Sequence, residues 1–185
     1  MSSHVCPWWL GYLLASPVRR LMYDPHAILV PYIRESMTVL EPGPGMGFFT
    51  LEIARLLGPS GRVVAVELQP RMLEGLRRRA AKAGLLERIE ARPVTSGSLG
   101  VTDLAGRVDF ALAFAVVHEL PAARPFFLEI ASALKPGGSL LMAEPKGHVK
   151  PGQVSAELEA AERAGLELVG RPPIRRSYTA LLRKA

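Results

Sequence analysis

Three glycines and a preceding acid form the stretch of this sequence best suited to hold a ligand. Gly43, Gly45 and Gly47 follow a short apolar run in G-x-G-x-G spacing, and Glu41 lies just before them. In a turn from a strand to a helix, backbone N–H groups face a ligand, and glycine lets that ligand approach closely. Dinucleotide enzymes use G-x-G-x-x-G, where the helix faces a pyrophosphate. The spacing and the acid favour a ligand with an ammonium group, although a tight turn without any ligand also fits.

A second acid, Glu67, lies twenty residues after Gly47, at the end of the apolar run RVVAVE. A carboxylate at the end of a second strand can accept hydrogen bonds from both ribose hydroxyls of an adenosine. Alternatively, the acid stabilises the N-terminus of the next helix through the helix dipole, and both roles are compatible. The glycine loop and the acid together indicate a ligand that contains adenosine.

His118 is the best candidate for a catalytic side chain. It follows the buried run 108–115, at the end of a strand where open α/β sheets bind ligands, and a histidine can accept a proton near neutral pH. A histidine that only holds the loop by hydrogen bonds is an equal alternative. Glu119 follows His118 in the chain and either assists it or is an acid exposed to solvent. Glu144 ends the next strand at the same edge, and His148 follows as either a substrate contact or an exposed loop histidine.

Strand-like and helical patterns alternate along the chain, which predicts βαβ units and a mainly parallel sheet. The predicted strands cover 37–41, 62–67, 88–92, 108–115, 139–144, 166–169 and 177–182, and the predicted helices cover 46–57, 70–83, 121–134 and 153–164. The last two strands have no helix between them, so we expect them to pair as a hairpin at one edge. Helix 70–83 should turn Met72, Leu73, Leu76, Ala80 and Ala83 inward.

These segments resemble the class I S-adenosylmethionine-dependent methyltransferases, in particular the small-molecule branch typified by ubiquinone and menaquinone methyltransferases. The resemblance covers 37–185. It rests on VLEPGPGMGFFT, VVAVELQPRML, VDFALAFAVVHELP, LKPGGSLLMAEP and the terminal pair GLELVG and SYTALLRK. It implies an α/β, Rossmann-like, seven-stranded and mostly parallel sheet with an antiparallel C-terminal hairpin strand and helices on both faces. It also implies a methyltransferase domain over 37–185, with 1–36 as an N-terminal helical lid or cap.

The resemblance also assigns roles to residues. S-adenosylmethionine is the implied cofactor, with Glu67 on the ribose and Leu68 and Gln69 beside adenine. The family often carries an acid after the third strand, but this chain has Ser96 or Gly97 at that position, so backbone groups or Thr95 would bind adenine. In the fourth-strand motif, the resemblance implies that Ala113 contacts the cofactor and that His118 lies beside the substrate.

Composition limits the protein class without naming a substrate. The chain has 185 residues, 49% hydrophobic and 22% charged, which suits one globular domain. Its lone Cys6 fits a reducing cytoplasm, and its longest apolar run is far shorter than the ~20 residues of a membrane-spanning helix. The net charge of +6 could attract nucleic acid, but solvated arginines are favoured because no aromatics lie among them. His4, His26, His118 and His148 show no metal-ligand spacing with Cys6, so no metal is expected.

We therefore expect a cytoplasmic methyltransferase that acts on a small, apolar or aromatic acceptor. The aromatic N-terminus motivates this substrate class, because Trp8, Trp9, Tyr12 and Tyr23 could cover such an acceptor or, equally, pack in the core. The alternatives are an RNA or protein methyltransferase and a protein that binds the cofactor without transferring a methyl group. Neither a membrane span nor a nucleic-acid partner is favoured, and a homodimer is an open alternative.

Overall fold

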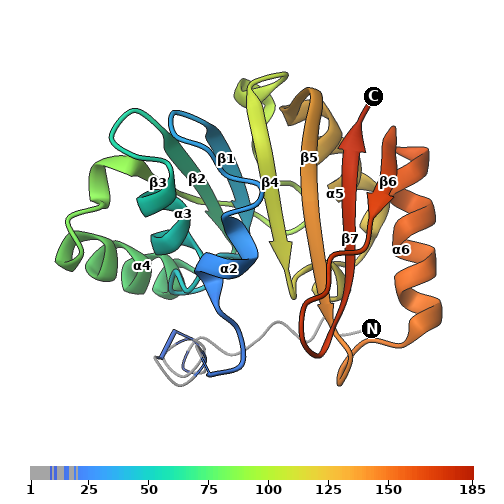
Figure 1. The fold of residues 1–185 in the computed structure, drawn as a ribbon, viewed down its shortest axis with the longest axis horizontal. Helices are drawn as coiled ribbons and strands as arrows, with labels where there is room; N and C mark the ends of the chain where they lie inside the picture. Colours follow the sequence, from blue (N-terminus) through green and yellow to red (C-terminus); the bar gives the residue numbers. More distant parts are fainter. Residues whose placement is uncertain (1–8, 10, 12–14, 17–18, 20) are drawn as a thin grey trace. The chain divides into compact units, whose positions relative to one another are not determined.

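The computed structural model describes residues 9, 11, 15–16, 19 and 21–185, and Figure 1 shows their secondary structure. The chain divides into two compact units, one over Cys6–Val94 and the other mainly over Thr95–Ala185. Three strands of the seven-stranded sheet belong to the first unit and four to the second. No helix of the described residues is long and apolar enough to cross a membrane.

The first unit is built from parallel strands joined by helices. Its elements are α2 (Pro25–Leu29), β1 (Thr38–Pro42), α3 (Thr50–Leu56), β2 (Arg62–Glu67), α4 (Pro70–Lys82), the 3-10 turn η2 (Leu86–Arg88) and β3 (Ile89–Pro93). The strands lie in the order β3-β2-β1, and all of them run parallel. All residues of β2 after Arg62 are buried, as expected for a parallel strand covered on both faces.

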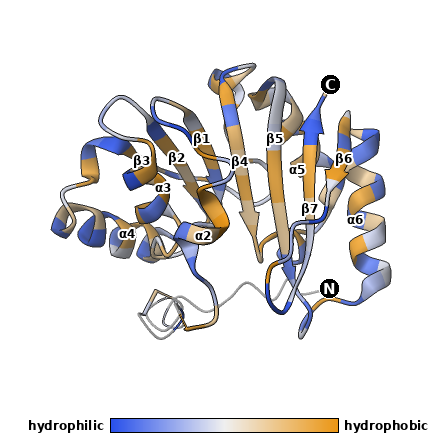
Figure 2. Cartoon of the chain, in the orientation of Figure 1, coloured by the Kyte–Doolittle hydropathy of each residue, from blue (hydrophilic) through white to orange (hydrophobic). Residues whose placement is uncertain are grey.

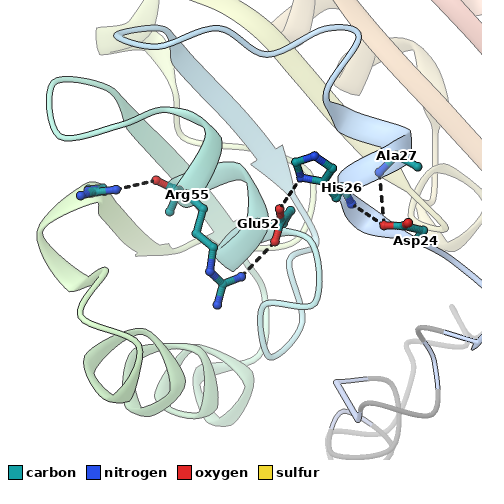
Figure 3. Close-up of polar contacts among 7 residues, drawn as sticks. Asp24, His26, Ala27, Glu52 and Arg55 are labelled. Atoms are coloured by element: carbon teal, nitrogen blue, oxygen red, sulfur yellow. Dashed lines mark hydrogen bonds and ion pairs between the residues drawn. The ribbon is translucent and has the colours of Figure 1, made fainter.

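A small polar network joins α2 to α3 ahead of β1. The Asp24 carboxylate caps α2 by accepting hydrogen bonds from the backbone N–H groups of His26 and Ala27, at 2.9 and 3.2 Å. Figure 3 shows that His26 also meets Glu52 of α3, 2.9 Å away, while Arg55 binds the other oxygen of Glu52 at 3.0 Å. Because His26 and Arg55 are exposed, each of these contacts contributes about 1 kcal/mol or less. The His26–Glu52 contact joins α2 to α3, whereas Arg55 and Glu52 both belong to α3.

The second unit contains the terminal hairpin. Its elements are the 3-10 turns η3 (Thr102–Leu104) and η4 (Val117–Glu119), the helices α5 (Ala123–Ala133) and α6 (Pro151–Arg163), and the strands β4 (Val108–Phe114), β5 (Leu134–Pro145), β6 (Leu166–Gly170) and β7 (Ser177–Lys184). The strands lie in the order β4-β5-β7-β6. Strand β4 is parallel to β5, and β7 is antiparallel to both of its neighbours. In Figure 2 the apolar residues of this unit are prominent along β4, whose interior is buried.

The predicted fold class is confirmed, because the sheet has seven strands and ends in an antiparallel hairpin. Several predicted boundaries were wrong. The helix predicted from Met46 begins at Thr50, because the glycine turn extends to that point. The helix predicted from Pro121 begins at Ala123, and strand β5 begins at Leu134 rather than Ser139, with a break in its register to β4.

One predicted core position is also wrong. Ala83 was expected on the inner face of α4 but is exposed, since the helix ends one residue earlier and Ala83 is its C-cap. Met72, Leu73, Leu76 and Ala80 are buried as predicted. The predicted boundary between a segment 1–36 and a domain 37–185 stays a prediction.

Candidate functional site

The glycine loop follows the carboxyl end of β1 and adopts the backbone that its composition requires. Gly43, Gly45 and Gly47 have positive φ angles of 65°, 55° and 84°. Residues other than glycine rarely adopt such backbone angles, so the loop requires glycine at these three positions. The Gly43 N–H donates to the Val66 carbonyl at 2.9 Å, which fixes the start of the loop against β2.

Helix α4 holds this loop from one side. A Cβ atom on Gly47 would lie 2.4 Å from Cδ1 of Leu76, and one on Gly75 would lie 2.8 Å from Cγ of Met46. Arg79 donates a hydrogen bond to the Met46 carbonyl. The loop and the helix therefore pack closely at both glycines, and a side chain at either one would require its neighbour to shift.

The sequence analysis missed this role of α4. Arg77, Arg78 and Arg79 belong to the arginines that were expected to be solvated, and this expectation is wrong for Arg79. Arg79 is half-buried and contacts the glycine loop, and Arg77 donates to the Ala91 carbonyl of β3 at 2.7 Å. The available signal was Gly75, because a glycine inside a helix costs about 1 kcal/mol and usually marks a close backbone approach.

Glu41 lies on β1 in a buried and incompletely paired environment. Only 3% of the residue is exposed, and its Oε2 has no hydrogen-bond partner. Burial raises the pKa of Glu41 to about 8, although the nearby Thr50 hydroxyl and the Arg19 charge lower it. A buried acid with an unpaired oxygen costs free energy unless a ligand or cation satisfies it. Glu41 is therefore suited to bind a positively charged group.

Glu67 connects the glycine loop to the start of α4. Its Oε2 accepts a hydrogen bond from the Gly45 N–H at 3.1 Å, and its Oε1 accepts one from the Gln69 N–H at 3.0 Å. Burial raises the pKa of Glu67, while these N–H groups and that of Leu68 lower it. Each carboxylate oxygen has a second lone pair, so hydrogen bonds to ribose hydroxyls are compatible with this geometry. Glu67 therefore accepts hydrogen bonds at the N-terminus of α4, as expected, and its contact with the ribose stays a prediction.

A separate polar cluster lies at the carboxyl ends of β4 and β5. His118 Nδ1 is hydrogen-bonded to Oε2 of Glu144, a side chain that is completely buried. The other oxygen of Glu144 accepts from the N–H groups of Val117 and Val116, at 2.9 and 3.3 Å. With the Nδ1–H group donating a hydrogen bond to the carboxylate, Nε2 of a neutral His118 is left as a proton acceptor.

Ala115 precedes this cluster in a strained conformation. Its φ is +58°, and its N–H donates to the Ala143 carbonyl at 2.7 Å, which continues the β4–β5 ladder by one residue. A non-glycine residue in the left-handed region costs about 1 kcal/mol or more and is often found at functional sites. The turn brings the backbone N–H groups of Val116 and Val117 onto Glu144, so it helps to place His118.

Charges around His118 favour its protonated form. Burial lowers its pKa, but the hydrogen bond and charge of Glu144 and the charges of Glu119 and Glu157 outweigh this and raise it above its usual value. Glu157 of α6 is itself buried, with Oε1 accepting from Gln153 at 3.2 Å and Oε2 unpaired. Burial and the Glu144 charge raise the pKa of Glu157 to about 7. The sequence analysis did not single out Glu157, since a polar residue inside a helix gives no signal of burial.

The remaining predicted site residues differ in accessibility. Leu68 is exposed and Gln69 half-exposed after β2, Thr95 and Ser96 are exposed, and Ala113 is fully buried inside β4. His148 is exposed in the loop after β5 and takes no part in the hydrogen bonds described above that hold His118. Their predicted contacts stay predictions. Trp9 is 58% exposed, so it does not pack in the core, whereas Trp8 and Tyr12 lie outside the described residues.

Comparison with known proteins identifies the family. Residues 33–170 match a family model described as a methyltransferase domain. The chain belongs to the class I S-adenosylmethionine-dependent methyltransferase family. The crystal structure of an S-adenosylmethionine-dependent methyltransferase from Aquifex aeolicus has the same fold, with a TM-score of 0.85 and 22% identity over 98% of this chain and 100% of that one.

Two curated relatives show how broad the family is. Arsenite methyltransferase from Halobacterium salinarum is 32% identical over 107 residues, or 58% of this chain. Protein-L-isoaspartate O-methyltransferase from Methanothrix thermoacetophila is 33% identical over 114 residues, or 60% of this chain. The matches span 27% and 48% of the length of those relatives. The ubiquinone and menaquinone branch therefore stays a prediction.

The glycine-loop residues fit the family's cofactor. Glu41 offers an unpaired buried oxygen to the ammonium group of the methionine part. An added Cβ on Gly45 would meet no atom within 4 Å, so open space lies beside the loop backbone. Glu67 would hold the ribose hydroxyls. When bound, S-adenosylmethionine supplies a methyl group on a sulfonium.

Proposed function

We propose that this chain transfers a methyl group from S-adenosylmethionine to an oxygen or other protonated atom of a small, apolar or aromatic acceptor. The observation that carries the proposal is the hydrogen bond from His118 Nδ1 to the buried carboxylate of Glu144. It orients the imidazole and leaves Nε2 to accept a proton. A base is useful in methyl transfer only when the acceptor carries a proton that must leave.

The curated relatives are compatible with a small acceptor. One curated relative is an arsenite methyltransferase and another a protein O-methyltransferase, so the family spans small and large acceptors. The lone Cys6 supports a cytoplasmic location for the reaction.

The proposal is tested with a panel of small phenols, enols and carboxylic acids and a cofactor labelled in its methyl group. His118→Gln should lower kcat by about 10²- to 10⁴-fold, the usual contribution of general base catalysis, while binding of S-adenosylhomocysteine stays unchanged. His26→Gln, a histidine change on the exposed surface of α2, is the matched control. Full activity of His118→Gln would show that His118 is not the general base. Transfer only to macromolecules would overturn the small acceptor.

The pH profile gives a second test of the same base. His118 must be neutral to accept a proton, and its pKa is raised, so kcat/KM should increase with pH and level off above that raised pKa. Glu144→Gln removes the charge that raises it, so the midpoint should move to lower pH as the maximal rate falls. An unchanged midpoint would mean that another group limits the rate.

An RNA acceptor is the second candidate, because the net charge is +6 and the β6–β7 loop exposes Arg171, Arg175 and Arg176. RNA binding through these arginines would weaken steeply as the salt concentration rises. The absence of a gel shift at low salt would exclude it. A protein that binds the cofactor without turnover is the third alternative, and one methylated product would exclude that.

A further inference from the structure

Two loops at the carboxyl end of β5 carry positive charge and no negative charge. One loop joins β5 to α6, and the other joins β6 to β7. Segments 145–152 (PKGHVKPG) and 171–177 (RPPIRRS) contain neither Asp nor Glu. Their lysines and arginines, which we call the basic edge, are all exposed and form no ion pair with an acid in the described part of the chain: Lys146, Lys150, Arg171, Arg175 and Arg176.

The two loops are held side by side. The Lys146 N–H donates a hydrogen bond to the Arg176 carbonyl at 2.9 Å, and Pro145 is paired with Ser177 across the β5–β7 ladder. Nζ of Lys146 lies 5.3 Å from the ring centroid of Tyr178, a cation–π contact that restricts where the ammonium can lie. In Figure 1 both loops lie at the bottom of the view, where β5 ends and β7 begins. Their charges therefore belong to one surface.

The β6–β7 loop is also fixed by its own hydrogen bonds. The Thr179 hydroxyl donates to the Pro172 carbonyl at 2.6 Å, and the Ser177 N–H donates to the Ile174 carbonyl at 3.2 Å. Arg176 has a φ of +57°, a strained conformation for a residue other than glycine and one that is frequent at ligand sites. A loop that is already ordered loses little conformational freedom when it binds a ligand. The arginines are thus displayed from a fixed backbone.

The basic edge lies next to the His118–Glu144 pair. Glu144, which binds His118, directly precedes Pro145 and is paired with Tyr178 of β7. Because residues advance by about 3.3 Å along a strand, the backbone of Lys146 lies only about 7 Å beyond that of Glu144. A group a few bonds away from the reacting atom of an acceptor at His118 could therefore contact the basic edge.

The chemistry of the basic edge favours a phosphate group. Clustered cations concentrate anions, the planar fork of an arginine matches two phosphate oxygens, and a lysine adds a point charge. The positive charge does not continue along α6 and β6, which expose the acids Glu159, Glu162 and Glu167 against one base, Arg163. A compact anion fits this confined surface better than a long RNA strand does. We propose that the basic edge binds a phosphate group carried by the small acceptor. This inference rests on the proposed function, because it requires the reacting atom of that acceptor to lie at His118.

Two phenols that differ in one substituent, 4-hydroxyphenyl phosphate and 4-methoxyphenol, probe this contact. Calorimetry, with and without S-adenosylhomocysteine, should show that the wild type binds the phosphate at least about 10-fold more tightly, as two exposed ion pairs allow. Lys146→Gln and Arg175→Gln should each reduce this preference about 5-fold, and the double variant should abolish it. The affinity for 4-methoxyphenol should not change, because it offers no anion.

Arg183→Gln is the matched control, since it removes an exposed charge at the other end of β7 and should leave the preference unchanged. Thermal melts show whether each variant is folded. Equal affinity of the wild type for the two phenols, or an unchanged preference in the double variant, would overturn the inference. It would also be overturned if the double variant lost only the binding of single-stranded RNA, since the surface would then serve a macromolecule. If the phosphate preference is lost as expected but the wild type neither binds S-adenosylhomocysteine nor methylates any acceptor, the phosphate contact stands and the proposed function fails.

Discussion

The burial of Glu41 predicts that cofactor binding is coupled to the release of a proton. Its pKa is raised to about 8, chiefly by burial, so the carboxyl group is mostly protonated at neutral pH. An ammonium group binds the ionised form and favours it. S-adenosylhomocysteine should therefore bind more tightly as the pH rises toward 8, because less work is spent on removing the proton from Glu41.

The size of the effect follows from the pKa. A carboxyl group with a pKa of about 8 is about 1% ionised at pH 6, about 9% at pH 7 and about 50% at pH 8. If only the ionised form binds, the affinity should increase about 50-fold from pH 6 to pH 8, and about 0.9 proton should leave per ligand at pH 7. Calorimetry at pH 7 in two buffers of different ionisation enthalpy measures that proton directly.

Two controls isolate Glu41 in this measurement. Glu41→Gln cannot ionise, so its affinity should be weak and nearly independent of pH. 5′-Methylthioadenosine has no ammonium group, so its binding to the wild type should release no proton. A wild-type affinity that is constant from pH 6 to pH 8 would refute the reasoning, since Glu41 would then be ionised before the ligand binds or would not touch the ammonium.

The same shift predicts the sign of a stability change. Because the folded pKa lies above the unfolded value of 4.5, the folded state holds a proton that the unfolded state has released between about pH 4.5 and 8. The free energy of unfolding of the wild type should therefore fall as the pH rises through this window. Glu41→Gln should lack this loss, so its melting temperature relative to the wild type should increase with pH.

Two further predictions concern the cofactor loop. Glu67→Ala should weaken S-adenosylhomocysteine binding about 10- to 100-fold in calorimetry, because a charged acceptor for the ribose hydroxyls is lost. Glu90→Ala, which removes an exposed acid on β3, is the control. Equal affinities of the two variants would exclude the ribose contact. Gly47→Ala should lower the free energy of unfolding by more than the ~1 kcal/mol that a positive φ costs, since its Cβ would also lie 2.4 Å from Leu76. Gly84→Ala is the control, because Gly84 has a similar φ of +67° and its Cβ would meet no atom within 4 Å. Urea unfolding of both variants isolates the contact with Leu76. An equal loss of unfolding free energy in both would show that Leu76 moves aside at little cost.

Much of the fold could be predicted from local pattern. Strand β2 has the predicted bounds, and the terminal strands pair as the predicted hairpin, because an apolar run bounded by turn residues specifies a buried strand without further context. Boundaries at turns were less predictable. Met46 and Phe49 have the apolar spacing of a helix, but the glycine turn takes up those residues, so α3 is a turn shorter than the pattern indicated.

The sequence alone determined the glycine loop and the position of Glu67, because the spacing of glycines and acids along one βαβ unit sets local backbone geometry. Only the tertiary structure decided how these groups are charged and held. The Glu41 pKa depends on burial by surrounding elements, the Arg79 contact with Met46 joins residues 33 apart, and the His118–Glu144 hydrogen bond joins residues 26 apart. Burial and long-range hydrogen bonds depend on how helices pack onto strands, and residue spacing does not specify which distant residues that packing brings together.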